Sequence, residues 1–134
     1  MTVYCLYKNL EMWQTLMESG DEVYKNNYRK LSLKYYESCC QIASLISEKN
    51  KDYTFIEIKS LRKYGINLIN LGRVKDGLFR LEKAVTLQKK LPRNIAAIEA
   101  LLCLNVILEH PLPEDLSQYY IKRRASLADI LINS

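Results

Sequence analysis

Along most of the chain, apolar residues recur at steps of three and four positions, the spacing that places side chains on one face of an α-helix. The pattern predicts six helices, over residues 4–26, 28–47, 52–71, 74–90, 93–109 and from 113 onward. Asp52 is placed to cap the third helix, Gly72 to end it and Pro92 to stop the fourth. Pro113 suits the first turn of the sixth helix. The short connections between these segments predict antiparallel neighbours.

The composition supports helices and argues against a sheet. The 134 residues include only 4 glycines and 3 prolines, whereas an all-β sandwich or barrel needs many tight turns. With 49% apolar and 26% charged residues, the chain has the make-up of an ordinary globular protein. We therefore expect one all-α domain over residues 1–134.

The sequence matches itself without gaps when it is shifted by 45 residues. Residues of similar size coincide in the pairs Gly20 and Gly65, Ser32 and Gly77, Tyr36 and Leu81, and Cys39 and Ala84. Asn27 coincides with Gly72, and both residue types tolerate a left-handed backbone. The match predicts repeat units over residues 13–46 and 58–91, followed by a degenerate unit or cap over 93–132. In each unit, the glycine of the first helix would let the second helix approach closely.

The repeat resembles the tetratricopeptide repeat (TPR) family, whose unit is a helix-turn-helix with a Leu-x-x-x-Gly first helix and an Ala-x-x-x-aromatic-x-x-Ala second helix. The residues that carry the resemblance best are Leu61, Gly65, Leu68, Gly72, Gly77, Leu81, Ala84 and Pro92. The spacing of 45 residues exceeds the family's usual length of about 34, so the resemblance implies a long-helix variant. It also implies three antiparallel helix pairs in a right-handed superhelical stack, and a protein-binding adaptor or complex subunit rather than an enzyme.

A binding groove follows from the resemblance, lined by the exposed face of the first helix of each unit. Its residues would be Gln14, Met17, Asp21 and Tyr24 in the first unit and Lys59, Arg62, Lys63, Ile66 and Ile69 in the second. The lysines and the arginine form a basic patch beside the isoleucines, unless they are only a solvated face. Such a patch suits an acidic or amphipathic segment of a partner protein. Members that clamp the C-terminal carboxylates of chaperones use a Lys and an Asn where this chain has Met17 and Asp21, which excludes that ligand.

Three alternatives compete with this interpretation. Basic residues alternate with tyrosines over residues 24–30 and 34–36, which could stack bases and neutralise phosphates, although a net charge of +5 is modest for a nucleic-acid-binding protein. Ser126 follows two arginines in a motif that resembles the substrates of basophilic kinases. The size also fits the small TPR chaperones of bacterial secretion systems, but those proteins are commonly acidic.

Residues for metal or nucleophilic chemistry are few. The four cysteines form no CxxC pair, and His110 is the single histidine, so we expect no metal site, no cofactor and no catalytic centre. We expect reduced, mostly buried thiols and a cytoplasmic location, with the nucleus as the alternative.

The longest apolar stretch, Ile95 to Leu108, is too short and too polar to span a membrane. It is apolar over nearly its whole surface, which predicts self-association or an obligate partner at this end of the chain.

Overall fold

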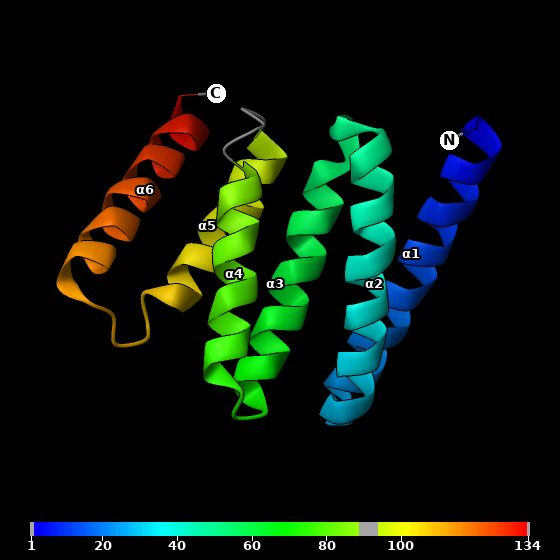
Figure 1. Ribbon diagram of the computed structural model, residues 1–134, viewed down its shortest axis with the longest axis horizontal. Coiled ribbons are helices and arrows are strands. Elements are labelled where there is room, and N and C mark those ends of the chain that lie inside the picture. The colour runs from blue at the N-terminus through cyan, green and yellow to red at the C-terminus, as the bar shows by residue number, and fades with distance from the viewer. Residues whose placement is uncertain (1, 89–93, 134) are drawn as a thin grey trace.

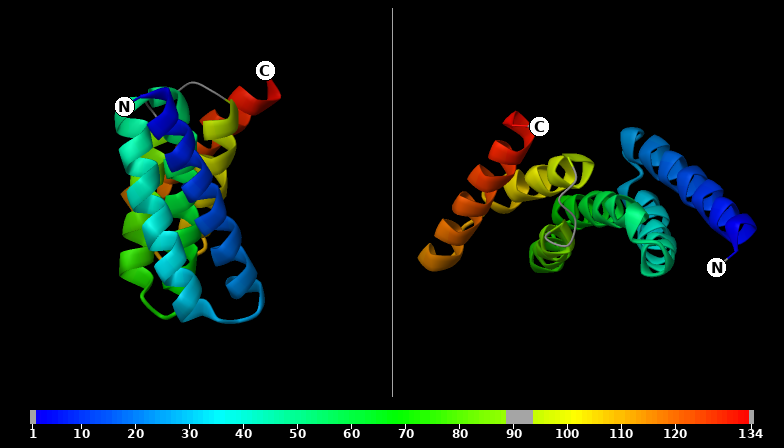
Figure 2. Two further views of the ribbon diagram at one scale, coloured as in Figure 1. Left: turned by 90° about the vertical axis from the view of Figure 1, so that its right-hand side faces the viewer. Right: turned by 90° about the horizontal axis from the view of Figure 1, so that it is seen from above.

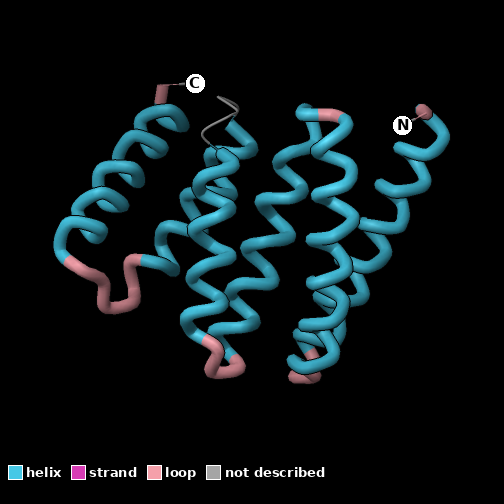
Figure 3. The backbone as a smooth tube through the Cα atoms, viewed as in Figure 1, coloured by secondary structure: helices cyan, strands magenta, loops and turns pink. Residues whose placement is uncertain are grey.

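The computed structural model describes residues 2–88 and 94–133, and over these residues the chain is all-helical. Its helices are α1 (Val3–Lys25), α2 (Arg29–Lys49), α3 (Thr54–Asn70), α4 (Val74–Gln88), α5 (Asn94–Ile107) and α6 (Glu114–Ile132), with a short 3₁₀ turn over Lys51–Tyr53. Short loops join the helices within residues 2–88 and 94–133, and no strand occurs in this part of the chain (Figure 3). The prediction of six helices and no sheet is confirmed for these residues.

Consecutive helices run in opposite directions and lie side by side across the molecule (Figure 1). Each helix from α1 to α5 packs against the next helix along the chain, and α5 also packs against α3. Seen from above, α1 and α5 lie on one side of α3, while α2 and α4 lie on the other (Figure 2, right). We call the side formed by α1, α3 and α5 the odd-helix face, and the side formed by α2 and α4 the even-helix face.

Glycines permit the close approach of the paired helices, as the repeat predicts. A Cβ atom at Gly65 would lie 2.9 Å from the carbonyl oxygen of Gly77, and one at Gly77 would lie 2.5 Å from the carbonyl oxygen of Gly65. A Cβ atom at Gly20 would lie 2.8 Å from the ring of Tyr36. Tyr36 and Leu81 are both buried, so these two large side chains fill equivalent spaces in the two units.

The turns that end α1 and α3 have the same geometry, 45 positions apart. Asn27 has φ of 69° and Gly72 has φ of +87°, which confirms that both adopt a left-handed backbone. The N–H of Tyr28 donates to the carbonyl of Val23 at 2.8 Å, and the N–H of Arg73 donates to that of Leu68 at 2.9 Å. This six-to-one bond with a left-handed residue is the Schellman arrangement, which satisfies carbonyls that the helix end leaves unpaired.

The start of the third helix differs from the prediction. Asp52 does not cap the third helix but lies inside the 3₁₀ turn, and the oxygen of the Asn50 side chain accepts from its N–H at 3.1 Å. The prediction is wrong because Asn50, with the extended φ of −144° and ψ of 105°, caps the 3₁₀ turn that contains Asp52, and Tyr53 then precedes α3 without a side-chain cap. Pro92, expected to stop the fourth helix, lies outside the described residues. No described helix combines the length and apolar character needed to cross a membrane.

The largest apolar core lies where α3, α4, α5 and α6 meet. From α5, six residues are almost completely buried there: Ala96, Ala97, Ala100, Cys103, Leu104 and Ile107. On the opposite side of the same helix, Ile98 and Leu102 are exposed to solvent. The expectation of a partner or of self-association at this end therefore stays a prediction. Ile98 and Leu102 are exposed apolar side chains of α5 that such a contact would cover.

Candidate functional site

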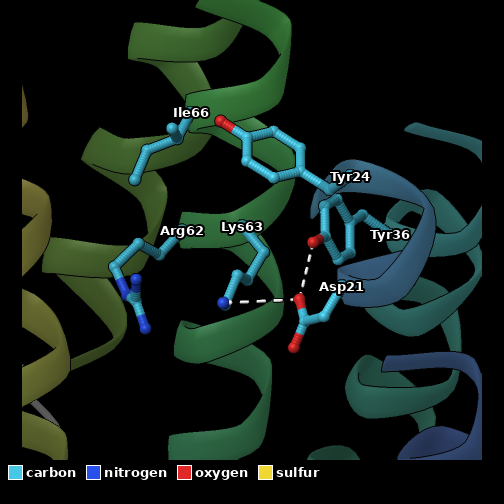
Figure 4. Close-up of a pocket in the computed structure, with 6 residues that line it drawn as sticks. All are labelled: Asp21, Tyr24, Tyr36, Arg62, Lys63 and Ile66. Carbon is cyan, nitrogen blue, oxygen red and sulfur yellow. Dashed lines mark hydrogen bonds and ion pairs between the residues drawn. The ribbon is translucent and has the colours of Figure 1, made fainter. Parts of the chain in front are cut away.

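A hollow of about 320 Å³ opens between α1, α2 and α3 (Figure 4). Its lining residues are Asp21, Tyr24, Tyr36, Arg62, Lys63 and Ile66. The structure thus brings together five of the residues that the sequence placed in a groove. Tyr36 also lines the hollow, although it was not among the predicted groove residues. The repeat pattern assigns it to the core, yet the hydroxyl end of its buried side chain reaches the hollow.

The carboxylate of Asp21 lies at the centre of a polar network between three helices. The hydroxyl of Tyr36 donates to Asp21 Oδ1 at 2.6 Å, and Lys63 Nζ lies 3.4 Å from the same oxygen (Figure 4). Burial of the phenol and its hydrogen bond to Asp21 raise the pKa of Tyr36, so the hydroxyl keeps its proton and remains a donor. The network connects the end of α1 to both α2 and α3.

A second ion pair joins α3 to α5. Arg62 Nε donates to Glu99 Oε2 at 2.8 Å, and the two side chains are 16% and 14% exposed. The predicted basic patch therefore needs correction, because Arg62 and Lys63 each have a carboxylate partner on a neighbouring odd-numbered helix. Lys59, the third cation of the patch, lies with its Nζ 5.9 Å from the centre of the Trp13 ring. The sequence could not show these partners, which are distant along the chain.

Other predicted groove residues lie elsewhere. Met17 is only 4% exposed and packs in a core cluster with Tyr36 and Tyr64, so its side chain is not available to a partner. Ile69 is partly buried where α3 contacts α4, because its side chain occupies the space left by the missing Cβ of Gly77. The exposed side chain of Gln14 donates to Glu18 at 3.2 Å.

Sequence reasoning missed two hydrogen bonds that connect α1 to α3. The indole N–H of Trp13 donates to Ser60 Oγ at 2.7 Å, and the side-chain amide of Asn70 donates to the hydroxyl of Tyr24 at 2.5 Å. A half-buried tryptophan needs an acceptor for its N–H, but that requirement does not identify which residue supplies it. With the Asp21–Lys63 pair, these bonds connect the two helices at three levels.

Three of the four thiols are poorly suited to nucleophilic chemistry. Burial raises the pKa of Cys39, Cys40 and Cys103 from the ordinary value of 9.0 to about 12, which leaves little of the reactive thiolate near neutral pH. Cys5 is exposed on α1. Within residues 2–88 and 94–133, no group of three or more His, Cys, Asp or Glu side chains is arranged to hold a metal ion.

Comparisons of the chain with family models, with curated proteins and with solved structures gave no match. The function must therefore be inferred from the geometry of the odd-helix face and from the residues that form it.

Proposed function

We propose that the protein is a TPR-like adaptor or complex subunit that binds a segment of another protein on its odd-helix face. The observation that carries the proposal is the hollow, since five of the groove residues that the TPR resemblance implies line it together. Its volume lies at the lower end of the roughly 300–1,000 Å³ of small-molecule pockets, a size suited to one or two side chains of a bound segment. Its lining combines aromatic and aliphatic surface with charges of both signs.

The contacts among the odd-numbered helices support this function because they preform the surface. The Arg62–Glu99 pair holds α3 to α5, and the hydrogen bonds of Trp13 to Ser60 and of Asn70 to Tyr24 hold α3 to α1. A surface that is ordered before binding loses less conformational entropy when a partner docks. The long-helix TPR-like stack of three helix pairs, which remains part of the proposal, would present this face as its concave side.

The nucleic-acid alternative has narrower support. Tyr36 is buried, and the Arg29 guanidinium lies 4.9 Å from the centre of the Tyr24 ring, so neither ring has both faces open to stacked bases. Tyr28 is exposed beside Arg29 and Lys30, at a second hollow of about 540 Å³ near the turn between α1 and α2. Binding of a fluorescent single-stranded oligonucleotide that is lost in the Tyr28→Ala variant would favour this alternative.

The proposal is tested by selecting binders from a random peptide library and measuring their affinity by fluorescence anisotropy. Changing Ile66 to Lys places a charge in the hollow and should weaken the selected peptides by about tenfold or more. Phe79→Lys on the even-helix face is the matched control, because Phe79 is exposed on α4. Peptides that lose affinity only with the control variant, or a library that yields no binder, would contradict the proposal.

A further inference from the structure

The two ion pairs of the odd-helix face differ in how far solvent reaches them. The side chains of Arg62 and Glu99 are 16% and 14% exposed, whereas those of Lys63 and Asp21 are 29% and 44% exposed. The Arg62–Glu99 pair is also shorter, with 2.8 Å between Nε and Oε2, against 3.4 Å between Lys63 Nζ and Asp21 Oδ1. Solvent screens the more exposed Asp21–Lys63 pair better than the Arg62–Glu99 pair, so the Asp21–Lys63 pair can exchange partners at a smaller cost.

Both members of the exposed pair have spare hydrogen-bonding capacity. The contacts of Asp21 with Tyr36 and Lys63 both use Oδ1, and the other carboxylate oxygen points away from them (Figure 4). The Lys63 ammonium has three N–H donors and lies 3.4 Å from Asp21 Oδ1, so it can also donate to a partner. A partner therefore meets an available anion and an available cation side by side. A segment with charges of one sign would be attracted by one of these two side chains and repelled by the other.

Apolar surface lies next to these charges. In Figure 4, the ring of Tyr24 and the side chain of Ile66 lie together on one side of the hollow, while Asp21 and Lys63 lie on the other. A single bound segment can thus place an apolar side chain against Tyr24 and Ile66 while its charged groups reach the ion pair.

We propose, resting on the proposed function, that the occupant of the hollow is an amphipathic helix of a partner protein that carries a neighbouring acid and base one turn from an apolar residue. On a helix, residues at i, i+3 and i+4 share one face, so one turn presents these three groups together. The acid pairs with Lys63, the base pairs with Asp21, and the apolar side chain enters beside Ile66. The sequence alone indicates an acidic or amphipathic segment, and this charge complementarity favours an amphipathic segment of mixed charge over a purely acidic one.

The test uses a displayed library of helical peptides of about 15 residues, with a fixed leucine and the next turn randomised. Wild-type protein should enrich peptides that carry one acidic and one basic residue at the third and fourth positions after the leucine. Asp21→Asn keeps an acceptor for Tyr36 but removes the anion, so enrichment should move to peptides with two acidic residues. Lys63→Gln should move it to peptides with two basic residues. Glu48→Gln and Lys34→Gln, at exposed sites of α2, are the matched controls and should leave the preference unchanged.

The outcomes separate this inference from the function on which it rests. Suppose that the selected peptides lose binding with Ile66→Lys but show no charge preference, or show a preference that Asp21→Asn does not change. This result would overturn the mixed-charge partner and would leave the proposed binding face standing. Peptides that bind regardless of Ile66→Lys, or the absence of any binder, overturn both. A dimer that light scattering detects and that Ile66→Lys dissociates would place a second copy of the chain in the hollow, which also overturns the inference.

Discussion

Arg62 Nε on α3 lies 2.8 Å from Glu99 Oε2 on α5, and both side chains are largely buried. The pair joins two helices that are not consecutive in the chain and that run in the same direction (Figure 1). Loss of one member leaves the other charge in a poorly hydrated position, which costs more than loss of an exposed ion pair.

We expect Arg62→Met and Glu99→Gln each to lower the free energy of unfolding by about 1–3 kcal/mol. The free energy of unfolding of the double variant should fall by less than the sum of the two single decreases, because each single change already leaves the remaining partner unpaired. Urea unfolding checks both values. The exposed Arg73–Asp76 pair provides the control, and Arg73→Met should cost less than about 1 kcal/mol. Strict additivity of the Arg62 and Glu99 changes would show that the pair does not act as a unit.

Gly77→Ala should destabilise the protein by about 1–3 kcal/mol, because the new methyl group meets the carbonyl oxygen of Gly65 at 2.5 Å and the two helices must separate. Gly65→Leu should cost more, since its larger side chain also meets Leu81. Ser44→Ala, at an exposed helical site, is the control. Thermal unfolding followed by circular dichroism measures the difference, and an unchanged Gly77→Ala protein would disprove the close contact.

The stability of the protein should fall at alkaline pH partly through Tyr36. Its pKa is raised in the folded protein, while the unfolded chain releases this proton near the ordinary value of 10.0. Above about pH 10 the folded state therefore binds more protons than the unfolded state, and stability decreases as pH rises.

Tyr36→Phe lacks this titration, so its stability deficit at neutral pH should shrink above about pH 10. Urea midpoints across this pH range give the measurement, with Tyr28→Phe at an exposed position as the control. A deficit for Tyr36→Phe that stays constant with pH would count against a buried, hydrogen-bonded phenol.

Thiol labelling should distinguish the cysteines. In the folded protein, a negatively charged aromatic disulfide reagent should react promptly with Cys5, which is exposed, and much more slowly with Cys39 and Cys103. All four should react promptly in urea. The Cys5→Ser variant should lose the fast phase alone, and a fast phase that survives in this variant would mean that a buried thiol is accessible.

The sequence predicted the helices better than the surface. Helical periodicity and the left-handed residues Asn27 and Gly72 are local signals, and both agree with the structure. The charge of the groove was mispredicted, because the partners of Arg62 and Lys63 lie on other helices and can be identified only after those helices are packed. Met17 was misplaced for a similar reason, since the rotation of α1 about its axis depends on its contacts with α2 and α3.

The hydrogen bonds and ion pairs of α3 also limit how its length can change during evolution. Ser60, Lys63 and Asn70 all contact residues of α1, and Arg62 contacts α5. One residue inserted in the middle of α3 would rotate every later side chain by about 100° and separate several of these contacts at once. Insertions should therefore be tolerated at the turns rather than within this helix, and relatives of the protein should vary in loop length while keeping the length of α3.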